Sequence, residues 1–206
     1  MVDDREKEHV VEGAHALLAI AGAIDALLFL HAGGLLAVYM TGNTSKLGQA
    51  FSRLDGSAAG ALALVIACFV AATTAAAWLG TRAGRARASV LLGVVAALLA
   101  LAQVLAEAKY PLRTIALIAA ATGTLNQVLP AEAGVTFITG SLVGLGRAVA
   151  SGRGKRALGL ALRWVAFLAG AVLATAADER FHVPVLGGVA GVVAIAALVT
   201  LIPNGE

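Results

Sequence analysis

Six apolar runs, each long enough to cross a bilayer as a helix, dominate the sequence. A hydrocarbon core of about 30 Å requires roughly 17 to 25 apolar residues in α-helical form. Strands of a membrane barrel would be shorter and would alternate apolar with polar residues, and these runs do not alternate. The sequence therefore predicts an all-α, polytopic membrane protein that forms one membrane domain over residues 1–206. The six runs lie at residues 14–30, 58–79, 88–106, 112–129, 157–177 and 183–202.

Charged residues are too few for a water-exposed surface. They make up 13% of the chain, against 60% hydrophobic residues, whereas soluble domains carry about 25% charged residues. The net charge of +3 comes from short basic clusters between the apolar runs, which is typical of cytoplasmic loops. We therefore expect a lipid bilayer, and no nucleic acid, as the partner of this surface.

The sequence repeats itself after about 98 residues. Residues 39–43 (Tyr-Met-Thr-Gly-Asn) match residues 137–141 (Phe-Ile-Thr-Gly-Ser), and residues 22–25 match residues 123–126 after a gap of about three residues. A long internal repeat indicates duplicated structural units. We place the two units at about residues 13–106 and 111–203.

Two further apolar stretches, residues 35–51 and 134–150, are interrupted at the Thr-Gly motif of each unit. If both stretches re-enter the membrane and return, each unit has three crossings and the second unit is inverted, as in many transporters. If both stretches cross fully, the protein has eight crossings and the units run parallel. Lys and Arg in the loops favour cytoplasmic termini, but the charge counts do not separate these two topologies.

The polar motifs also point to a family. At Gly22-x-x-Asp25, at residues 40–44 (Met-Thr-Gly-Asn-Thr) and at residues 139–141, the chain resembles the YoaK family of bacterial multi-pass membrane proteins. The resemblance covers nearly the whole chain, and the combination of the aspartate with the Thr-Gly-Asn-Thr motif is fairly specific. It implies a bacterial inner-membrane protein of about six helices. Most members of that family are uncharacterised, so the resemblance implies no substrate.

Asp25 is the first candidate site residue, because it lies inside the first apolar run. A charge at the centre of a membrane helix costs at least about 2.5 kcal/mol, and such residues usually face a cavity or a partner. We expect a proton, cation or substrate site at Asp25; the alternative is a structural hydrogen bond to another helix. The equivalent residue of the second unit, Asn126, keeps the hydrogen-bonding shape without the charge.

The two interrupted stretches are the second candidate. Glycine weakens a helix, and Thr, Asn and Ser are typical N-cap residues, so the motifs predict an extended entry followed by a half-helix. Such a break is tolerated where it is buried in protein or lines water. The first amides of a half-helix would suit an anion or a carboxylate; the alternative is a kink without a ligand. Lys46, one turn beyond the first break, is expected to pair with Asp25, to attract an anion or to reach the interface.

These features favour secondary transport, or a channel, for a small polar or anionic solute, with proton or cation coupling. The alternative is a non-transporting scaffold or sensor subunit, and a homo-oligomer is compatible with either. The sequence has no catalytic motif, no cofactor motif and no metal-ligand spacing, so we expect no enzyme, no cofactor and no metal. The proposed site combines Asp25, Thr41, Gly42, Asn43, Thr44 and Lys46 of the first unit with Asn126, Thr139, Gly140 and Ser141 of the second.

Overall fold

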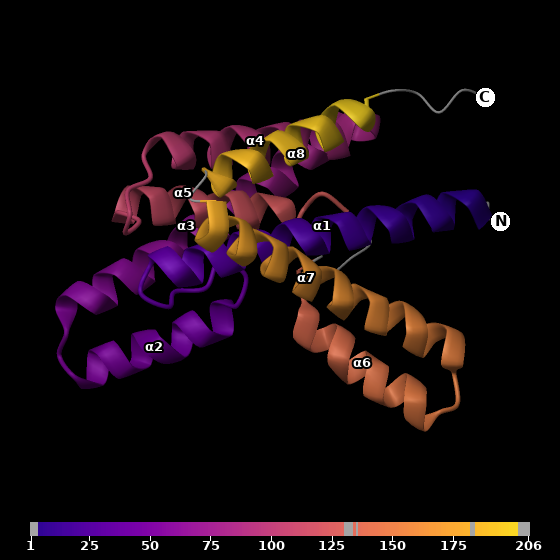
Figure 1. Ribbon diagram of the computed structural model, residues 1–206, viewed down its shortest axis with the longest axis horizontal. Helices are drawn as coiled ribbons and strands as arrows, with labels where there is room; N and C mark the ends of the chain where they lie inside the picture. The colour runs from indigo at the N-terminus through magenta and orange to yellow at the C-terminus, as the bar shows by residue number, and fades with distance from the viewer. Residues whose placement is uncertain (1–3, 130–133, 135, 182–183, 202–206) are drawn as a thin grey trace.

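The computed structural model describes residues 4–129, 134, 136–181 and 184–201. These residues form eight α-helices and one short 3-10 helix, and no strand (Figure 1). The prediction of an all-helical protein is therefore confirmed for the described part of the chain. The helices are α1 (Asp4–His31), α2 (Met40–Ser52), α3 (Gly56–Ala83), η1 (Gly84–Ala86), α4 (Arg87–Val104), α5 (Leu112–Leu125), α6 (Ile138–Ala150), α7 (Gly154–Phe181) and α8 (Val185–Val199).

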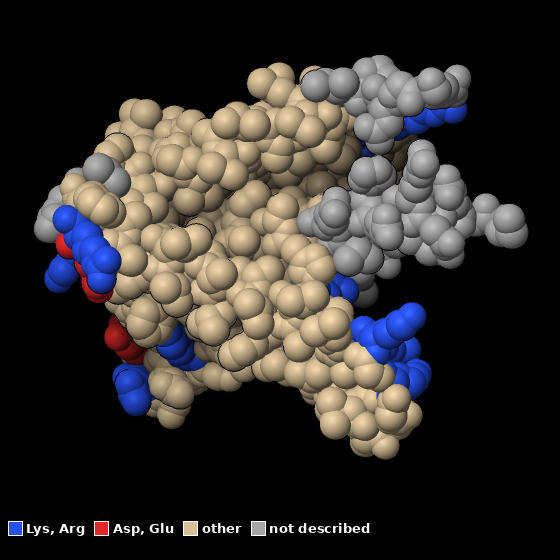
Figure 2. All heavy atoms as spheres, turned by 45° about the vertical axis from the view of Figure 1, so that its right-hand side comes forward, with Lys and Arg blue, Asp and Glu red and all other residues tan. Residues whose placement is uncertain are grey.

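Much of the helical surface is apolar. Three segments, Gly13–His31, Gly56–Val104 and Gly154–Phe181, are long and apolar enough to cross a membrane, and α5, α6 and α8 are shorter apolar helices. Figure 2 shows charged side chains at opposite ends of the molecule, with a broad uncharged band between them. A surface of this kind suits a hydrocarbon solvent, in agreement with the predicted membrane protein.

The sequence repeat is also a repeat of secondary structure. Helices α6, α7 and α8 begin at residues 138, 154 and 185, which is 98 residues after the first residues of α2, α3 and α4. Helices α2 and α6 both have 13 residues, and α3 and α7 both have 28. The equivalent helices α1 and α5 differ in length, because α1 has 28 residues and α5 only 14.

Helices of one unit pack against helices of the other unit. Helix α1 of the first unit packs mainly against α7 of the second, while α5 of the second packs against α3 and α4 of the first. Glycines allow this contact: a methyl group on Gly22 would overlap the Phe167 carbonyl, and one on Gly123 would overlap the Phe69 carbonyl. Small residues let membrane helices approach closely. The core between the units consists mainly of buried side chains from α1, α4, α5 and α8, with a few from α3 and α7.

One end of the bundle, which we name the His31 face, gathers the ends of α1, α4 and α7. The His31 ring lies 2.9 Å from the Ala108 carbonyl and 2.9 Å from the Asp178 carboxylate. The Tyr110 amide donates to the His31 carbonyl at 2.9 Å. The end of α4 also contacts the start of α8, because the Gly187 amide donates to Gln103 at 3.0 Å.

The opposite end, which we name the Arg87 face, gathers the ends of α3, α5 and α8. The Arg87 guanidinium donates to the Gln127 carbonyl just beyond α5, at 2.8 and 2.9 Å. The hydroxyls of Ser89 and Thr200 lie 2.9 Å apart and join α4 to the residue after α8. Consecutive long helices therefore run in opposite directions between the two faces.

Candidate functional site

A cavity of about 710 Å³ lies between the two units. Its walls come from α1, α3, α7, the residues just after α5, the segments that lead into α2 and α6, and the first residues of these two helices. Sixteen described residues line it: Asp25, Leu36, Val38, Tyr39, Met40, Thr41, Phe69, Thr73, Asn126, Gln127, Gly134, Thr136, Phe137, Ile138, Thr139 and Phe167.

The lining follows the repeat. Fourteen of these sixteen residues form seven pairs at equivalent positions of the two units, and only Thr73 and Gln127 have no equivalent in the lining. Each unit thus presents the same set of positions to the cavity, as expected for a site at the interface of two repeats. The pairs are Asp25–Asn126, Leu36–Gly134, Val38–Thr136, Tyr39–Phe137, Met40–Ile138, Thr41–Thr139 and Phe69–Phe167.

Asp25 and Asn126 anchor the segments that lead into α2 and α6. Asp25 Oδ1 accepts the Val38 amide at 2.8 Å. Asn126 Oδ1 accepts the amide and the hydroxyl of Thr136 at 3.2 and 2.8 Å, and its Nδ2 donates to the Thr122 carbonyl at 3.0 Å. The two side chains therefore perform the same backbone-anchoring role, and they differ in charge.

Each glycine of the two Thr-Gly motifs packs against an aromatic ring. A methyl group on Gly42 would lie 2.5 Å from Cδ1 of Tyr39, and one on Gly140 would lie 2.9 Å from Cδ1 of Phe137. Each ring thus packs on the bare Cα of the glycine three residues later. Neither glycine lines the cavity, but both help to position an aromatic side chain that does.

Asn43 holds the first break together from within the protein. Its side chain is fully buried, its Nδ2 donates to the Leu36 carbonyl at 2.6 Å, and its Oδ1 accepts the Leu36 amide at 3.3 Å. A buried backbone segment needs such partners, because an unpaired amide or carbonyl is costly away from water. Asn43 therefore stabilises the backbone of the break, and its side chain is absent from the cavity lining.

Lys46 does not pair with Asp25. Its ammonium donates to the Gly34 carbonyl, and the side chain is absent from the cavity lining. Gly34 has a φ of +76°, and the turn at this glycine presents the carbonyl to the ammonium. The Lys46 ammonium is therefore not placed to bind an anionic solute in the cavity.

The predicted capping of the half-helices is wrong. Helices α2 and α6 begin at Met40 and Ile138, so their N-cap residues are Tyr39 and Phe137, and neither makes a side-chain cap hydrogen bond. Tyrosine and phenylalanine rings cannot replace the short oxygen-bearing side chains that reach the first amides. The Thr and Ser of the motifs lie inside the helices instead.

The predicted site residues divide into two groups. Asp25, Thr41, Asn126 and Thr139 meet at the cavity, although they come from four different segments of the chain. The others lie outside its lining. Thr44 donates to the Met40 carbonyl at 2.9 Å, and Ser141 is buried.

A family model described as "Protein of unknown function (DUF1275)" matches residues 13–200. The chain belongs to this family. The matched range covers nearly all of both units and contains every described residue that lines the cavity of this DUF1275 protein. Neither a curated protein nor a solved structure matches the chain.

The described lining of the cavity in this DUF1275 chain has one acidic residue and no basic residue. Among the described lining residues, Asp25 alone is ionisable to a carboxylate and none is Lys, Arg or His. Hydroxyls and amides supply the other polar groups, and the Thr73 hydroxyl is occupied by the carbonyls of Phe69 and Gly123 at 2.8 and 3.2 Å. Within the described residues, no group of three His, Cys, Asp or Glu side chains is placed to hold a metal ion.

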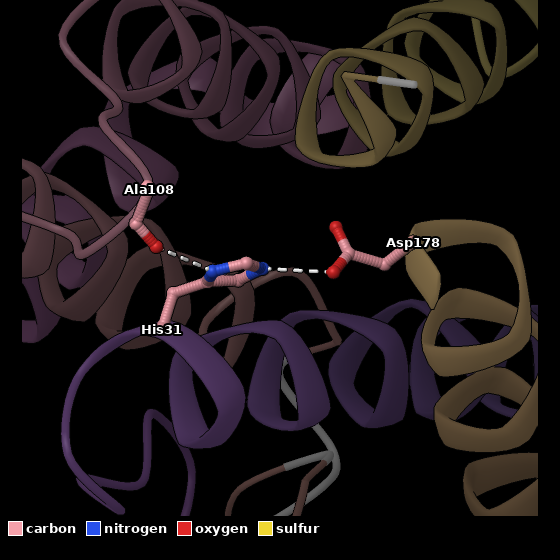
Figure 3. Close-up of polar contacts among 3 residues, drawn as sticks. All are labelled: His31, Ala108 and Asp178. Atoms are coloured by element: carbon pink, nitrogen blue, oxygen red, sulfur yellow. Dashed lines mark hydrogen bonds and ion pairs between the residues drawn. The ribbon is translucent and has the colours of Figure 1, made fainter. Parts of the chain in front are cut away.

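The DUF1275 chain carries a second polar cluster at the His31 face. Figure 3 shows the His31 ring between the Ala108 carbonyl and the Asp178 carboxylate, which come from the α4–α5 loop and α7. The ring also stacks on Tyr110, with 4.7 Å between the centroids. Burial, and then the nearby Asp178 charge, raise the pKa of Tyr110 to about 12. The partners of His31 lie 77 and 147 residues away in the chain, so no local sequence pattern predicts this cluster.

Proposed function

We propose that the protein is a secondary transporter or channel that moves a small polar solute through the cavity between two inverted units. The observation that carries the proposal is the composition of the cavity lining. Seven pairs of equivalent residues from the two units, including Asp25–Asn126 and Thr41–Thr139, line one space. A non-transporting scaffold would have no need to bring both breaks and the membrane aspartate to one cavity.

The helix ends support an inverted arrangement. Helix α1 ends at the His31 face, while its repeat partner α5 starts next to that face and ends at the Arg87 face. Helices α2 and α6 begin at the cavity between the units, because their first residues, Met40 and Ile138, line it, as expected for half-helices of an inverted repeat. These two features favour six crossings with two half-helices, rather than eight crossings.

The distribution of basic residues supports an orientation. The Arg87 face carries the arginine-rich turn between α3 and α4 and the basic segment between α6 and α7. Cytoplasmic loops are enriched in Lys and Arg, so this face is assigned to the cytoplasm, with both termini on the same side. A bacterial inner-membrane location and the narrower assignment to the YoaK family are part of the same proposal, and they rest on the motifs at Asp25 and the Thr-Gly breaks.

The electrostatics of the cavity favour a solute that is not an anion. Asp25 is the one formal charge among the described lining residues, and the Lys46 ammonium is bound to the Gly34 carbonyl. A buried carboxylate repels an anion strongly in a medium of low dielectric. Within the predicted class of small polar or anionic solutes, the polar alternative is the one that we propose.

Flux through purified protein in liposomes tests the proposal. The cavity would be narrowed with Thr41→Trp and Thr139→Trp, and the matched control is Thr74→Trp, because Thr74 is exposed on α3 and absent from the lining. We expect uptake of small neutral and cationic polar solutes by the native protein and by the control, with at least tenfold slower uptake by both cavity variants. Equal flux in all four proteins, or no flux above empty liposomes, would refute transport through this cavity.

A further inference from the structure

We infer that the cavity binds an organic ammonium ion, a cation whose charge is surrounded by alkyl groups. This inference deepens the proposed function, because it names the class of solute for the same site. It rests on two features of the described lining residues, a set of four aromatic rings and one carboxylate.

Four aromatic side chains line the cavity: Tyr39, Phe69, Phe137 and Phe167. They form two repeat-related pairs, so rings from both units surround the same space. Tyr39 and Phe137 are 48% and 65% exposed, so neighbouring protein groups leave a large part of both residues uncovered. The faces of aromatic rings attract cations, and cages of such rings are a common way to bind quaternary ammonium groups.

Asp25 supplies the negative charge that such a ligand needs. It is the one carboxylate among the described lining residues, and no Lys or Arg in that lining neutralises it. An unpaired charge in a membrane protein is costly unless a partner is present. An ammonium ligand would supply that partner during each cycle of binding.

An inorganic cation fits the lining less well. Ca²⁺ and Mg²⁺ require about six or more oxygen ligands, but Asn126 Oδ1 and Asp25 Oδ1 are already engaged with backbone amides. Aromatic carbons cannot replace a strongly held hydration shell. An alkylated ammonium is weakly hydrated and presents methyl groups, which pack against Phe69, Phe167, Leu36 and Met40 of the lining.

A charge-matched pair of ligands tests the inference on purified protein in a non-ionic detergent. The probe is choline, and its neutral control is 3,3-dimethylbutan-1-ol, which has the same shape with carbon in place of nitrogen. We expect saturable heat of binding and an increase in melting temperature with choline chloride, and neither effect with the alcohol or with sodium chloride. Equal binding of choline and the alcohol would refute recognition of the charge.

Variants assign the binding to the named residues. Phe69→Leu and Phe167→Leu each remove one ring and should weaken choline binding by about 2- to 30-fold, the range for one cation–π contact. The control Phe51→Leu should bind choline normally, because Phe51 is 62% exposed on α2 and absent from this cavity. Asp25→Asn should weaken binding at least tenfold and still fold, because Asn126 already accepts the equivalent amide in the other unit. Unchanged affinity in the Asp25 and both ring variants would place the ligand elsewhere.

Binding and flux separate this inference from the proposed function. Choline binding without flux supports the ammonium site and contradicts transport. Flux of a neutral polar solute without choline binding supports transport and contradicts the ammonium site. Absence of choline binding by a well-folded native protein is sufficient to reject the inference.

Discussion

His31 Nε2 lies 2.9 Å from an oxygen of Asp178, although the two residues are 147 positions apart. The other ring nitrogen faces the Ala108 carbonyl, which can only accept a hydrogen bond. A carboxylate also only accepts, and the two residues form an ion pair when the ring is protonated. It joins α1 of the first unit to α7 of the second at the His31 face (Figure 3).

Removal of this ion pair should destabilise the helix bundle. The side chains of His31 and Asp178 are 22% and 23% exposed, so Asp178→Ala leaves a partly buried ring nitrogen without its hydrogen-bond partner. We expect a loss of about 1–3 kcal/mol in the free energy of unfolding, seen as a lower melting temperature in detergent. The control is Glu107→Ala, which removes a pair with Arg113 that is 57% and 62% exposed and should cost less than about 1 kcal/mol. Similar melting of both variants would show that the His31 pair is not a structural link.

Alkaline pH should weaken the same end of the bundle through Tyr110. The folded protein raises the pKa of Tyr110 to about 12 from an ordinary value of 10.0, first by burial and then by the Asp178 charge. A raised pKa means that the stabilisation is complete below about pH 10 and is lost as the pH rises through about 12. The melting temperature of the native protein should therefore fall more steeply above pH 10 than that of Tyr110→Phe, which keeps the ring on His31 but cannot ionise. Parallel pH profiles for the two proteins would contradict this assignment.

The contact between α1 and α7 should depend on the absence of one methyl group. A side chain at Gly22 would overlap the backbone carbonyl of Phe167, and backbone cannot move aside as a flexible side chain does. Gly22→Ala should cost several kcal/mol, the range of severe overpacking, and should reduce the yield of folded protein. The matched change Gly60→Ala meets no atom within 4 Å and should stabilise α3 by up to about 1 kcal/mol. A normal yield and melting temperature for Gly22→Ala would show that the helices can separate without loss.

The sequence predicted those features that depend on local pattern. The six apolar runs coincide with α1, α3, α4, α5, α7 and α8, and the Thr-Gly repeat located α2 and α6. Asp25 and Asn126 were recognisable because a polar residue inside an apolar run is unusual. Phe69 and Phe167 were not recognisable as cavity residues, because an aromatic side chain in an apolar run is equally suited to lipid, to the core or to a cavity. Their role depends on which helix packs against α3 and α7, and that information is absent from either run alone.

The contact that Lys46 makes also could not be predicted from the sequence. Lys46 lies one helical turn beyond the first break, and its charge is opposite to that of Asp25. The sequence therefore suggested an ion pair between the two residues. The fold of the chain at Gly34 decides otherwise, since the turn there brings a carbonyl within reach of the ammonium. Loop geometry of this kind depends on backbone torsions that periodicity and composition do not encode.

Two substitutions at Asp25 should separate its charge from its anchoring role. In Asp25→Asn the side-chain oxygen still accepts the Val38 amide, as Asn126 does for Thr136 in the second unit. Melting temperature and expression should therefore stay near native values, or rise slightly because a charge is removed from a membrane helix. Solute flux in liposomes, and its dependence on pH, should be lost or uncoupled, because no other described lining residue carries a charge.

Asp25→Ala removes the acceptor as well as the charge. The Val38 amide then lacks its partner, and the free energy of unfolding should fall by about 1–3 kcal/mol. Flux against pH, measured beside melting for the native protein and both variants, distinguishes the two roles. If Asp25→Asn melts normally and transports with native pH dependence, the carboxylate is not the coupling group. If Asp25→Asn is as unstable as Asp25→Ala, the charge itself is structural, and the cavity must recognise its solute through the aromatic rings and the threonines of the two breaks.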